Sequence, residues 1–334
     1  MSSPPRSPLA SSGEAPIDLG IVVVSYNTRR LTIDCLASVY RALSASDLRA
    51  HVWVVDNASP DGSAEGVRKR FPQATLVANQ ENLGFAGAAN VALEMMARSQ
   101  APPHHVLLLN PDTVVSEDAL ALMVAFLDQH PHVGIVGPQL LYGDGSFQHS
   151  AFHFPTLWMA FFDFWTINHR LIDSRLNGCY PRRPYESGEP FRIDHPLGAA
   201  LMIRWETIRQ IGPLDAGFFM YCEEIDWCLR ARAAGWTIYC LPGARITHLA
   251  AQSTKQFRDE MFVALWRSRY RLFDKHYSRL YRSVVRLIVR AGLRRRARQT
   301  RRALRREEID RDEATRRLAA YRQVAAMARP LSEA

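Results

Sequence analysis

Residues 107–115 read LLLNPDTVV, an apolar run, rich in Leu and then Val, that Asn-Pro-Asp interrupts once. Burying a carboxylate without a partner or a metal ion costs several kcal/mol, so Asp112 needs an explanation. A turn is one interpretation, because Asn and Asp around a proline end a strand at little cost. A ligand site at the end of a buried strand is the other.

The chain around this run alternates apolar strand-like segments with amphipathic segments. Strands that alternate with helices predict an α/β fold with a mostly parallel sheet and helices on both of its faces. Ser116 and the acidic residues after it predict the start of the fourth helix. The expected strands lie within 18–27, 51–59, 74–80 and 104–112, and the expected helices within 28–43, 60–71, 84–99 and 116–130.

Three of these expected strands end in polar residues, at the edge where parallel α/β sheets bind ligands. The residues are Asn27, Asp56 with Asn57, and Asn110 with Asp112. No G-x-G-x-x-G follows the first strand and no G-x-x-x-x-G-K is present, which argues against dinucleotide and Walker-type sites. Carboxylate and amide groups suit base edges, hydroxyl groups and a hard cation instead. Mg²⁺ and Mn²⁺ bind carboxylate and phosphate oxygens, so we expect Asp112 to hold one of them with a diphosphate.

The composition is that of an ordinary globular protein, with 334 residues of which 47% are hydrophobic and 22% charged. Five Cys without a C-x-x-C pair argue against a disulfide framework or a zinc site and favour a reducing cytosol. Residues 1–16 have no signal-peptide hydrophobic stretch and indicate a disordered leader. No apolar run approaches the ~20 residues that cross a bilayer, so we expect a soluble or peripheral protein.

Positive charge is concentrated near the C-terminus. Between Arg267 and Arg306, sixteen Lys and Arg residues stand against one acidic residue, so this segment carries +15. Because the whole chain carries +9, the remainder carries −6. From Lys275 to Arg290 the basic residues recur at helical spacing, and an apolar face from Tyr277 to Ile288 lies opposite. This pattern predicts an amphipathic helix that packs on the body or binds a membrane surface, a partner helix or a nucleic acid.

Among the interpretations that give this helix a function, binding to a membrane surface is favoured, because each Lys or Arg near anionic lipid gains about 1 kcal/mol of binding free energy. No nucleic acid is expected as a partner, since no recognised nucleic-acid-binding motif accompanies the charge.

Four segments, in order, resemble the family-two nucleotide-sugar glycosyltransferases: IVVVSYN (21–27), VVDNASPDGS (54–63), NLGFAGAAN (82–90) and LLNPDTVV (108–115). The similarity is to the rhamnosyltransferase-like branch, in which Asn-Pro-Asp replaces Asp-x-Asp. The resemblance extends from about Ile21 to about His248 and implies a GT-A fold. It also implies that Asp56 contacts the nucleotide base and that Asp112 binds the metal. By the resemblance, Asn82 and the Gly84–Asn90 segment lie near the nucleotide and its phosphates. Together with the polar strand ends, the full set of expected nucleotide-sugar contacts is Ser25, Asn27, Asp56, Asn57, Asn82, Gly84, Gly87, Asn90 and Asn110.

The segment CEEIDWCLRARAAG (222–235) has helical spacing, with Gly235 as its stop, and places three acidic residues in the first turn. Acids there also complement the helix dipole, and Asp226 is spaced to pair with Arg230. Inverting glycosyl transfer needs one general base for the acceptor hydroxyl. By resemblance to the Glu-Asp-x-Asp signature of the family, Glu224 stands where the base stands. We expect Glu224 as base, Glu223 as the second candidate and Asp226 in a structural role.

His248 follows another strand-like run. One interpretation is that His248 has a structural role and forms hydrogen bonds within the protein, as an isolated His commonly does. In the family that the chain resembles, a His at this place reaches the metal or the diphosphate, so His248 is the expected second metal ligand. The aromatic stretch at 150–165 is interpreted as core or interface, or as a border to an acceptor or lipid surface.

The sequence therefore predicts an inverting, Mg²⁺- or Mn²⁺-dependent glycosyltransferase of cell-surface polysaccharide synthesis. By the resemblance it moves rhamnose from dTDP-rhamnose to a glycan or a polyprenyl-diphosphate-linked acceptor, in the cytoplasm and peripheral on the inner face of the membrane. A UDP-hexose transferase, or a nucleotide-sugar-binding protein that has lost transfer, are the alternatives. The expected organisation is a leader (1–16), a catalytic domain (17–255, with a nucleotide-binding half to 115 and an acceptor half from 116) and a basic helical region (256–334).

Overall fold

The structure, a computed structural model, describes residues 17–165, 174–249 and 258–328. The predicted leader and the predicted boundary at 255 lie outside the described residues. In the first half the elements are β1 (Leu19–Ser25), α1 (Arg29–Ser44), β2 (Ala50–Asp56), α2 (Ser63–Arg70), β3 (Thr75–Ala78), α3 (Gly84–Arg98), β4 (His105–Leu109), β5 (Thr113–Val115), α4 (Ala119–Gln129) and β6 (Val133–Leu141).

The second half contains shorter strands and the C-terminal helices. Its elements are β7 (Phe147–Gln148), β8 (Ala151–Phe152), α5 (Leu157–Phe162), the 3-10 helix η2 (Arg175–Asn177), α6 (Arg182–Glu186), β9 (Phe191–Arg192), β10 (His195–Pro196), β11 (Ala200–Arg204), α7 (Trp205–Ile211), α8 (Glu223–Ala233), β12 (Thr237–His248), α9 (Arg258–His276), α10 (Arg279–Arg305) and α11 (Arg311–Met327).

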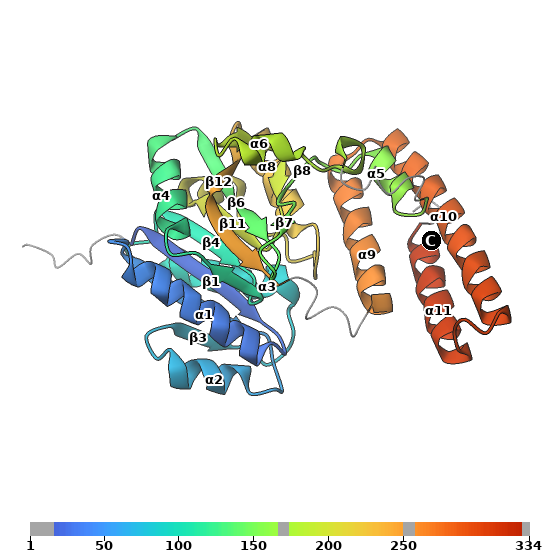
Figure 1. Cartoon of the computed structure of the whole chain (residues 1–334), viewed down its shortest axis with the longest axis horizontal. Helices are drawn as coiled ribbons and strands as arrows, with labels where there is room; N and C mark the ends of the chain where they lie inside the picture. Colours follow the sequence, from blue (N-terminus) through green and yellow to red (C-terminus); the bar gives the residue numbers. More distant parts are fainter. Residues whose placement is uncertain (1–16, 166–173, 250–257, 329–334) are drawn as a thin grey trace, which may run out of the picture.

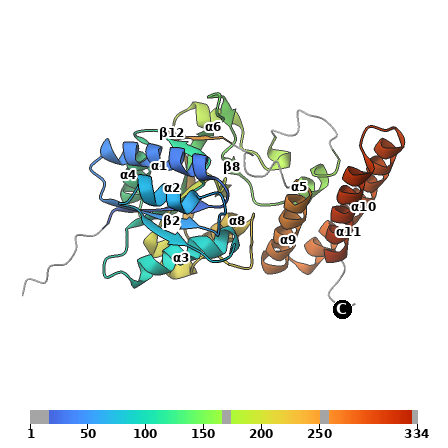
Figure 2. The same ribbon diagram turned by 90° about the horizontal axis from the view of Figure 1, so that it is seen from below.

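The main sheet follows the order β3-β2-β1-β4-β11-β6-β12-β5. The strands β3, β2, β1 and β4 run parallel, as do β6 and β12. Between β4 and β6, β11 runs antiparallel to both. The predicted mostly parallel sheet with helices on both faces is confirmed (Figures 1 and 2).

The run LLLNPDTVV forms two strands rather than one. Its leucines complete β4, which pairs with β1 in the middle of the sheet, whereas its valines form β5, which pairs with β12. Asn-Pro-Asp carries the chain from one to the other. Because Thr113 is in register with His248, Asp112 lies next to the end of β12.

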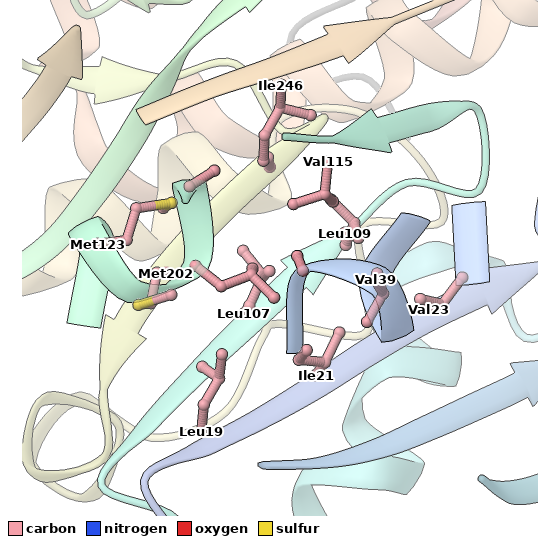
Figure 3. Close-up of a cluster of buried hydrophobic side chains, with 14 of the residues drawn as sticks. Leu19, Ile21, Val23, Val39, Leu107, Leu109, Val115, Met123, Met202 and Ile246 are labelled. Atoms are coloured by element: carbon pink, nitrogen blue, oxygen red, sulfur yellow. The ribbon is translucent and has the colours of Figure 1, made fainter. Parts of the chain in front are cut away.

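Two hydrophobic layers hold the sheet between its helices. The layer under α1 and α4 joins Ile21, Leu107, Leu109 and Met123 (Figure 3). The opposite layer is built from α3, α7 and α8 and includes the fully buried Trp227. Burial on both faces explains the near-continuous apolar sequence of the central strands.

Helices α5, α9, α10 and α11 share a separate core, to one side of the sheet (Figures 1 and 2). Trp266 is the largest fully buried side chain of this core, which also includes Val285 and Val289 of α10. Within the described residues, no helix is both long enough and apolar enough to span a bilayer.

Two predictions about helices are wrong in detail. The expected continuous helix across 275–290 breaks, because Ser278 caps a new helix by accepting a hydrogen bond from Tyr281 N (3.3 Å). Leu280 and Leu287, on the predicted apolar face, are 76% and 65% exposed, so this part of the face does not pack on the body. Helix α4 begins at Ala119 rather than near Ser116, whose hydroxyl donates to Arg245 O of β12 (2.6 Å).

Candidate active site

Asp56 ends β2 with a carboxylate that is buried but only half satisfied. Oδ2 accepts a hydrogen bond from Ser59 N (3.0 Å), whereas Oδ1 has no partner among the described residues. A buried carboxylate oxygen without a donor costs free energy that a bound N–H group would recover. Asp56 is therefore placed to receive a hydrogen-bond donor from a ligand.

Asn57 beside it is already saturated by the protein. Its Nδ2 donates to Asn82 Oδ1 (2.7 Å) and to Gly84 O (3.1 Å). Its Oδ1 accepts from Asn79 Nδ2 (3.1 Å) and from Leu83 N (3.0 Å). The side chain ties the end of β2 to the loop before α3, so its part in ligand binding is to shape that loop.

The end of β1 is also braced from within. The Ser25 hydroxyl lies 3.2 Å from that of Thr28 and 3.0 Å from that of Thr32, in a buried group of three. Asn27 has the positive φ of 54° and donates its N–H to Ser59 Oγ (3.0 Å). The Ser25 side chain is thus engaged with the protein, whereas the backbone at Asn27 turns at the sheet edge.

Gly84, with a φ of 71°, lets two loops meet. A Cβ there would lie 2.2 Å from Phe219 O, and Phe85 N donates to the same oxygen (2.8 Å). Nearly two turns into α3, the Asn90 side chain accepts a hydrogen bond from Leu214 N (3.0 Å) and donates one to Leu214 O (2.8 Å). The loop that precedes α8 is therefore fastened to the start of α3, in which Gly87 lies.

Asp112 and His248 are brought together by the pairing of β5 with β12. Asp112 is buried, and its Oδ1 lies 3.5 Å from His248 Nε2. Gln148 Nε2 lies 3.1 Å from the other ring nitrogen, Nδ1. No group of three His, Cys, Asp or Glu suited to a metal occurs in the described part of the chain. Two protein ligands with open positions suit Mg²⁺ or Mn²⁺, which keep positions for water and phosphate oxygens, so the residues fit the expected ion.

Asn110 connects this region with the acidic helix. Its backbone N–H donates to Ala199 O (2.9 Å), which holds the segment before β11 against the end of β4. A Cβ at the neighbouring Gly198 would lie 3.3 Å from Glu224 Cδ. Glu224 therefore lies against the segment that borders Asn110, although 114 positions separate the two along the chain.

Glu223 and Glu224 form a pair of carboxyl groups with unusual ionisation. Glu223 is buried, with no partner for Oε2 among the described residues, and burial together with the charge of Glu224 raises its pKa well above the ordinary value. Burial raises the pKa of Glu224 to about 7. A carboxyl group with a pKa of about 7 can take up or release a proton near neutral pH, which is the condition for general acid–base chemistry.

Asp226, in the same helical turn as Glu223 and Glu224, is fully buried and contacts residues of α9. The predicted pair with Arg230 is confirmed (2.9 Å), and Lys275 Nζ (2.8 Å) and His276 Nε2 (2.6 Å) also contact its carboxylate. Burial alone would raise the pKa of Asp226, but hydrogen bonds from His276 and Lys275 and the charge of Arg230 hold it below the usual range. The first turn of α8 is thereby joined to the last turn of α9.

Helix α9 also holds the loop that leads into α8, a connection that no sequence pattern indicated. Asp215 accepts from Arg271 (2.7 Å) and Lys275 (3.0 Å), and Ser268 Oγ donates to Met220 O (2.7 Å). The C-terminal helices thus help to position the loop and the acidic turn after it. The partners are 48–60 positions apart, beyond the reach of helical or strand periodicity.

The predicted nucleotide-sugar residues fall into two groups. Those whose side chains keep at least one polar group without a partner among the described residues are Asn27, Asp56, Asn82 and Asn110. Those whose side chains are engaged by the protein are Ser25, Asn57 and Asn90, whereas Gly84 and Gly87 offer only their backbone.

Two models of protein families match the sequence of this chain. The sequence model described as Glycosyl transferase family 2 matches residues 20–187, and the one described as Glycosyl transferase family group 2 matches residues 105–332. Residues 21–27, 54–63, 82–90 and 108–115, on which the resemblance rested, lie within the first match.

Two curated proteins and one solved structure are similar over much of the chain. The N-acetylglucosaminyl-diphospho-decaprenol L-rhamnosyltransferase of Mycobacterium tuberculosis is 27% identical over 82% of this chain and 90% of its own. Rhamnosyltransferase WbbL of Escherichia coli is 25% identical over 54% of this chain and 66% of its own. The mannosyltransferase PcManGT from Pyrobaculum calidifontis, solved with GDP-Man and Mn²⁺, superposes with a TM-score of 0.55 at 16% identity, covering 96% of this chain and 89% of its own.

Proposed function

Because the chain belongs to glycosyl transferase family 2, as a rhamnosyltransferase-like enzyme with a GT-A fold, we propose that it transfers rhamnose from dTDP-rhamnose. The acceptor in this proposal is a glycan or a polyprenyl-diphosphate-linked sugar of cell-surface polysaccharide synthesis. The precedent is the M. tuberculosis relative, whose name specifies a decaprenol-linked acceptor. The observation that carries the proposal is the convergence of Asp112, His248 and Glu224 around the end of β4.

The donor nucleotide would occupy the carboxyl edge of β1 and β2. The unpartnered Oδ1 of Asp56 would accept an N–H of the base, and thymine and uracil each present one. Asn82, whose Nδ2 is without a partner among the described residues, and Asn110 would contact the ribose, the diphosphate or the sugar. Asn57 and Asn90 would support these contacts by holding the loops in place.

The metal, Mg²⁺ or Mn²⁺, would be held by Asp112 and His248, with the donor diphosphate supplying further oxygens. When bound, such an ion neutralises the charge that develops on the leaving diphosphate. Gln148 would orient the His248 ring at Nδ1 with its amide turned over, so that Oε1, which has no partner among the described residues, accepts the Nδ1–H. Partners of metal-bound histidines accept a ring N–H in this way.

Glu224 would act as the general base. Its carboxylate would take the proton of the acceptor hydroxyl while that oxygen forms a bond to the anomeric carbon of the donor sugar. The bond from that carbon to the diphosphate breaks on the opposite face, so the anomeric configuration inverts. A base with a pKa of about 7 is matched to this task at neutral pH. Glu223 is the second candidate for the base, and burial together with the charge of Glu224 raises its pKa well above the ordinary value.

The acceptor would approach from the side of α8 and α9, and a lipid-linked acceptor would bring the enzyme to the inner face of a membrane. Charge supports this location, because α10 contains eleven arginines and no acidic residue. Juxtamembrane Arg gains about 1 kcal/mol near anionic lipid.

The experiment is a release assay for nucleoside diphosphate with dTDP-rhamnose, UDP-hexoses and GDP-mannose, with Mg²⁺ or Mn²⁺ and a lipid-linked acceptor. We expect metal-dependent release from dTDP-rhamnose that Asp112→Asn abolishes. Asp144→Asn, on an exposed turn, is the matched control and should be as active as wild type. Release from a UDP-hexose and from no other donor would show that the donor is a UDP-hexose rather than dTDP-rhamnose. Tight donor binding without release from any donor would favour a binding protein that has lost transfer.

A further inference from the structure

Helix α10 has a face that no other described element covers. Its buried side, with Val285, Val289 and Leu293, packs into the C-terminal core. On the free side, Leu280 and Leu287 lie two turns apart and are the two most exposed large hydrophobic side chains in the part of the chain that the structure describes. Exposed apolar side chains that recur along one helix face mark an interaction surface more often than isolated ones do.

A third exposed apolar side chain comes from the neighbouring segment. Trp158 of α5 is 59% exposed. Its segment runs alongside α10, because Tyr281 donates to Pro155 O (3.1 Å) and Arg295 donates to Phe164 O (2.8 Å). Tryptophan is favoured where one side of a molecule meets an apolar phase and the other meets water.

Arginines without an acidic partner flank this face. Arg282 and Arg286 pair with Asp274, but the exposed Arg279, Arg290 and Arg294 have no acidic partner among the described residues. Guanidinium groups bind phosphate oxygens in pairs, and their long stems let leucines beside them enter an apolar layer.

We propose that this face of α10, with Trp158, binds the surface of an anionic lipid bilayer, with Leu280 and Leu287 inserted below the headgroups. We name it the α10 lipid face, defined by Leu280, Leu287, Trp158, Arg290 and Arg294. The charge pattern favours lipid over a protein partner, because a helix in the plane of a membrane combines leucine and tryptophan with basic residues. The inference rests on the proposed function, because a lipid-linked acceptor would lie at such a surface. Its test does not require that the enzyme transfer sugar.

The test is flotation of the full-length protein with phosphatidylcholine vesicles, with and without phosphatidylglycerol. We expect wild type to float with the anionic vesicles and to be released by salt. The double variant Leu280→Ser/Leu287→Ser should bind anionic vesicles at least about tenfold more weakly, because two leucine side chains are no longer transferred from water into the bilayer. The control is Leu122→Ser on α4, 39% exposed on the catalytic body, which should float like wild type. Arg290→Gln should weaken binding by roughly fivefold.

Three results would overturn the inference. The first is equal flotation of wild type and the double leucine variant. The second is a wild type that does not float but forms dimers in light scattering, which the leucine substitutions dissociate. The third is a wild type that binds duplex DNA and no vesicles. Sugar transfer is measured separately, so a chain that floats without transferring sugar contradicts only the proposed function, and a chain that transfers without floating contradicts only the lipid face.

Discussion

The ionisation of Glu224 leads to a prediction about the rate as a function of pH. A base must be deprotonated to accept the acceptor proton, and burial raises the pKa of Glu224 to about 7. At pH 6, one unit lower, about one molecule in eleven carries the ionised base, so kcat/KM should be about a tenth of its plateau. The profile should rise through pH 7 and level off near pH 8.

Glu224→Gln removes the base and keeps the shape of the side chain. We expect kcat to fall by about 10²–10⁴-fold, with donor binding unchanged, because a positioned base contributes that much. Glu223→Gln is the matched control. Burial and the charge of Glu224 raise the pKa of Glu223 well above its ordinary value, and an amide there resembles the neutral carboxyl group, so the rise near pH 7 should remain.

The assay is the initial rate of nucleoside diphosphate release between pH 5 and 9, with thermal unfolding to show that each variant is folded. A flat profile in wild type, or a Glu224→Gln enzyme with full activity, would refute the reasoning. A large loss in Glu223→Gln with little loss in Glu224→Gln would move the base to Glu223.

Three further predictions concern the surroundings of the site. Asp226→Asn should lower the free energy of unfolding by about 2–3 kcal/mol in urea at pH 7, less than for a wholly buried pair because Lys275 is partly exposed. The pKa of Asp226 is lower in the folded than in the unfolded protein. The stabilisation is therefore complete above the unfolded pKa of about 3.9 and is lost as the pH falls through the lower folded pKa. A difference between wild type and variant that stays constant down to pH 2 would contradict this prediction. Gly84→Ala should destabilise by about 1–3 kcal/mol and weaken donor binding, because its Cβ meets Phe219 O, whereas Gly145→Ala, with a similar φ of 80° and nothing nearby, should leave donor binding unchanged. Gln148→Ala should weaken Mn²⁺ binding, measured by calorimetry, about 10–100-fold. An unchanged affinity would show that Gln148 does not orient His248 as a metal ligand.

The arrangement of the first half of the fold could be predicted because its signals are local. Each parallel strand is an apolar run that ends in polar residues, and amphipathic helices separate the strands. The insertion of β11 between β4 and β6 could not be predicted, since strand order depends on contacts between distant segments. The break at Ser278 was missed because the basic residues keep helical spacing across it.

The candidate site was predictable in position but not in detail. The motif around Asp56 and Asn57 marks a ligand edge, yet only the structure separates the carboxylate with a free oxygen from the amide that the protein saturates. The contacts of Asp226 with Lys275 and His276 have no signal in the sequence, because they join residues about fifty positions apart. Spacing shows only the neighbour at one helical turn, which is Arg230.

The most direct test of the central claim is product analysis. The full-length enzyme would be incubated with dTDP-rhamnose, Mg²⁺ and N-acetylglucosaminyl-diphospho-polyprenol, and the lipid fraction examined by mass spectrometry. We predict a product heavier by one deoxyhexose residue, formed with wild type and absent with Glu224→Gln. An acceptor that stays unchanged with every nucleotide sugar in the panel, by an enzyme that also fails to bind any of them, would contradict the account.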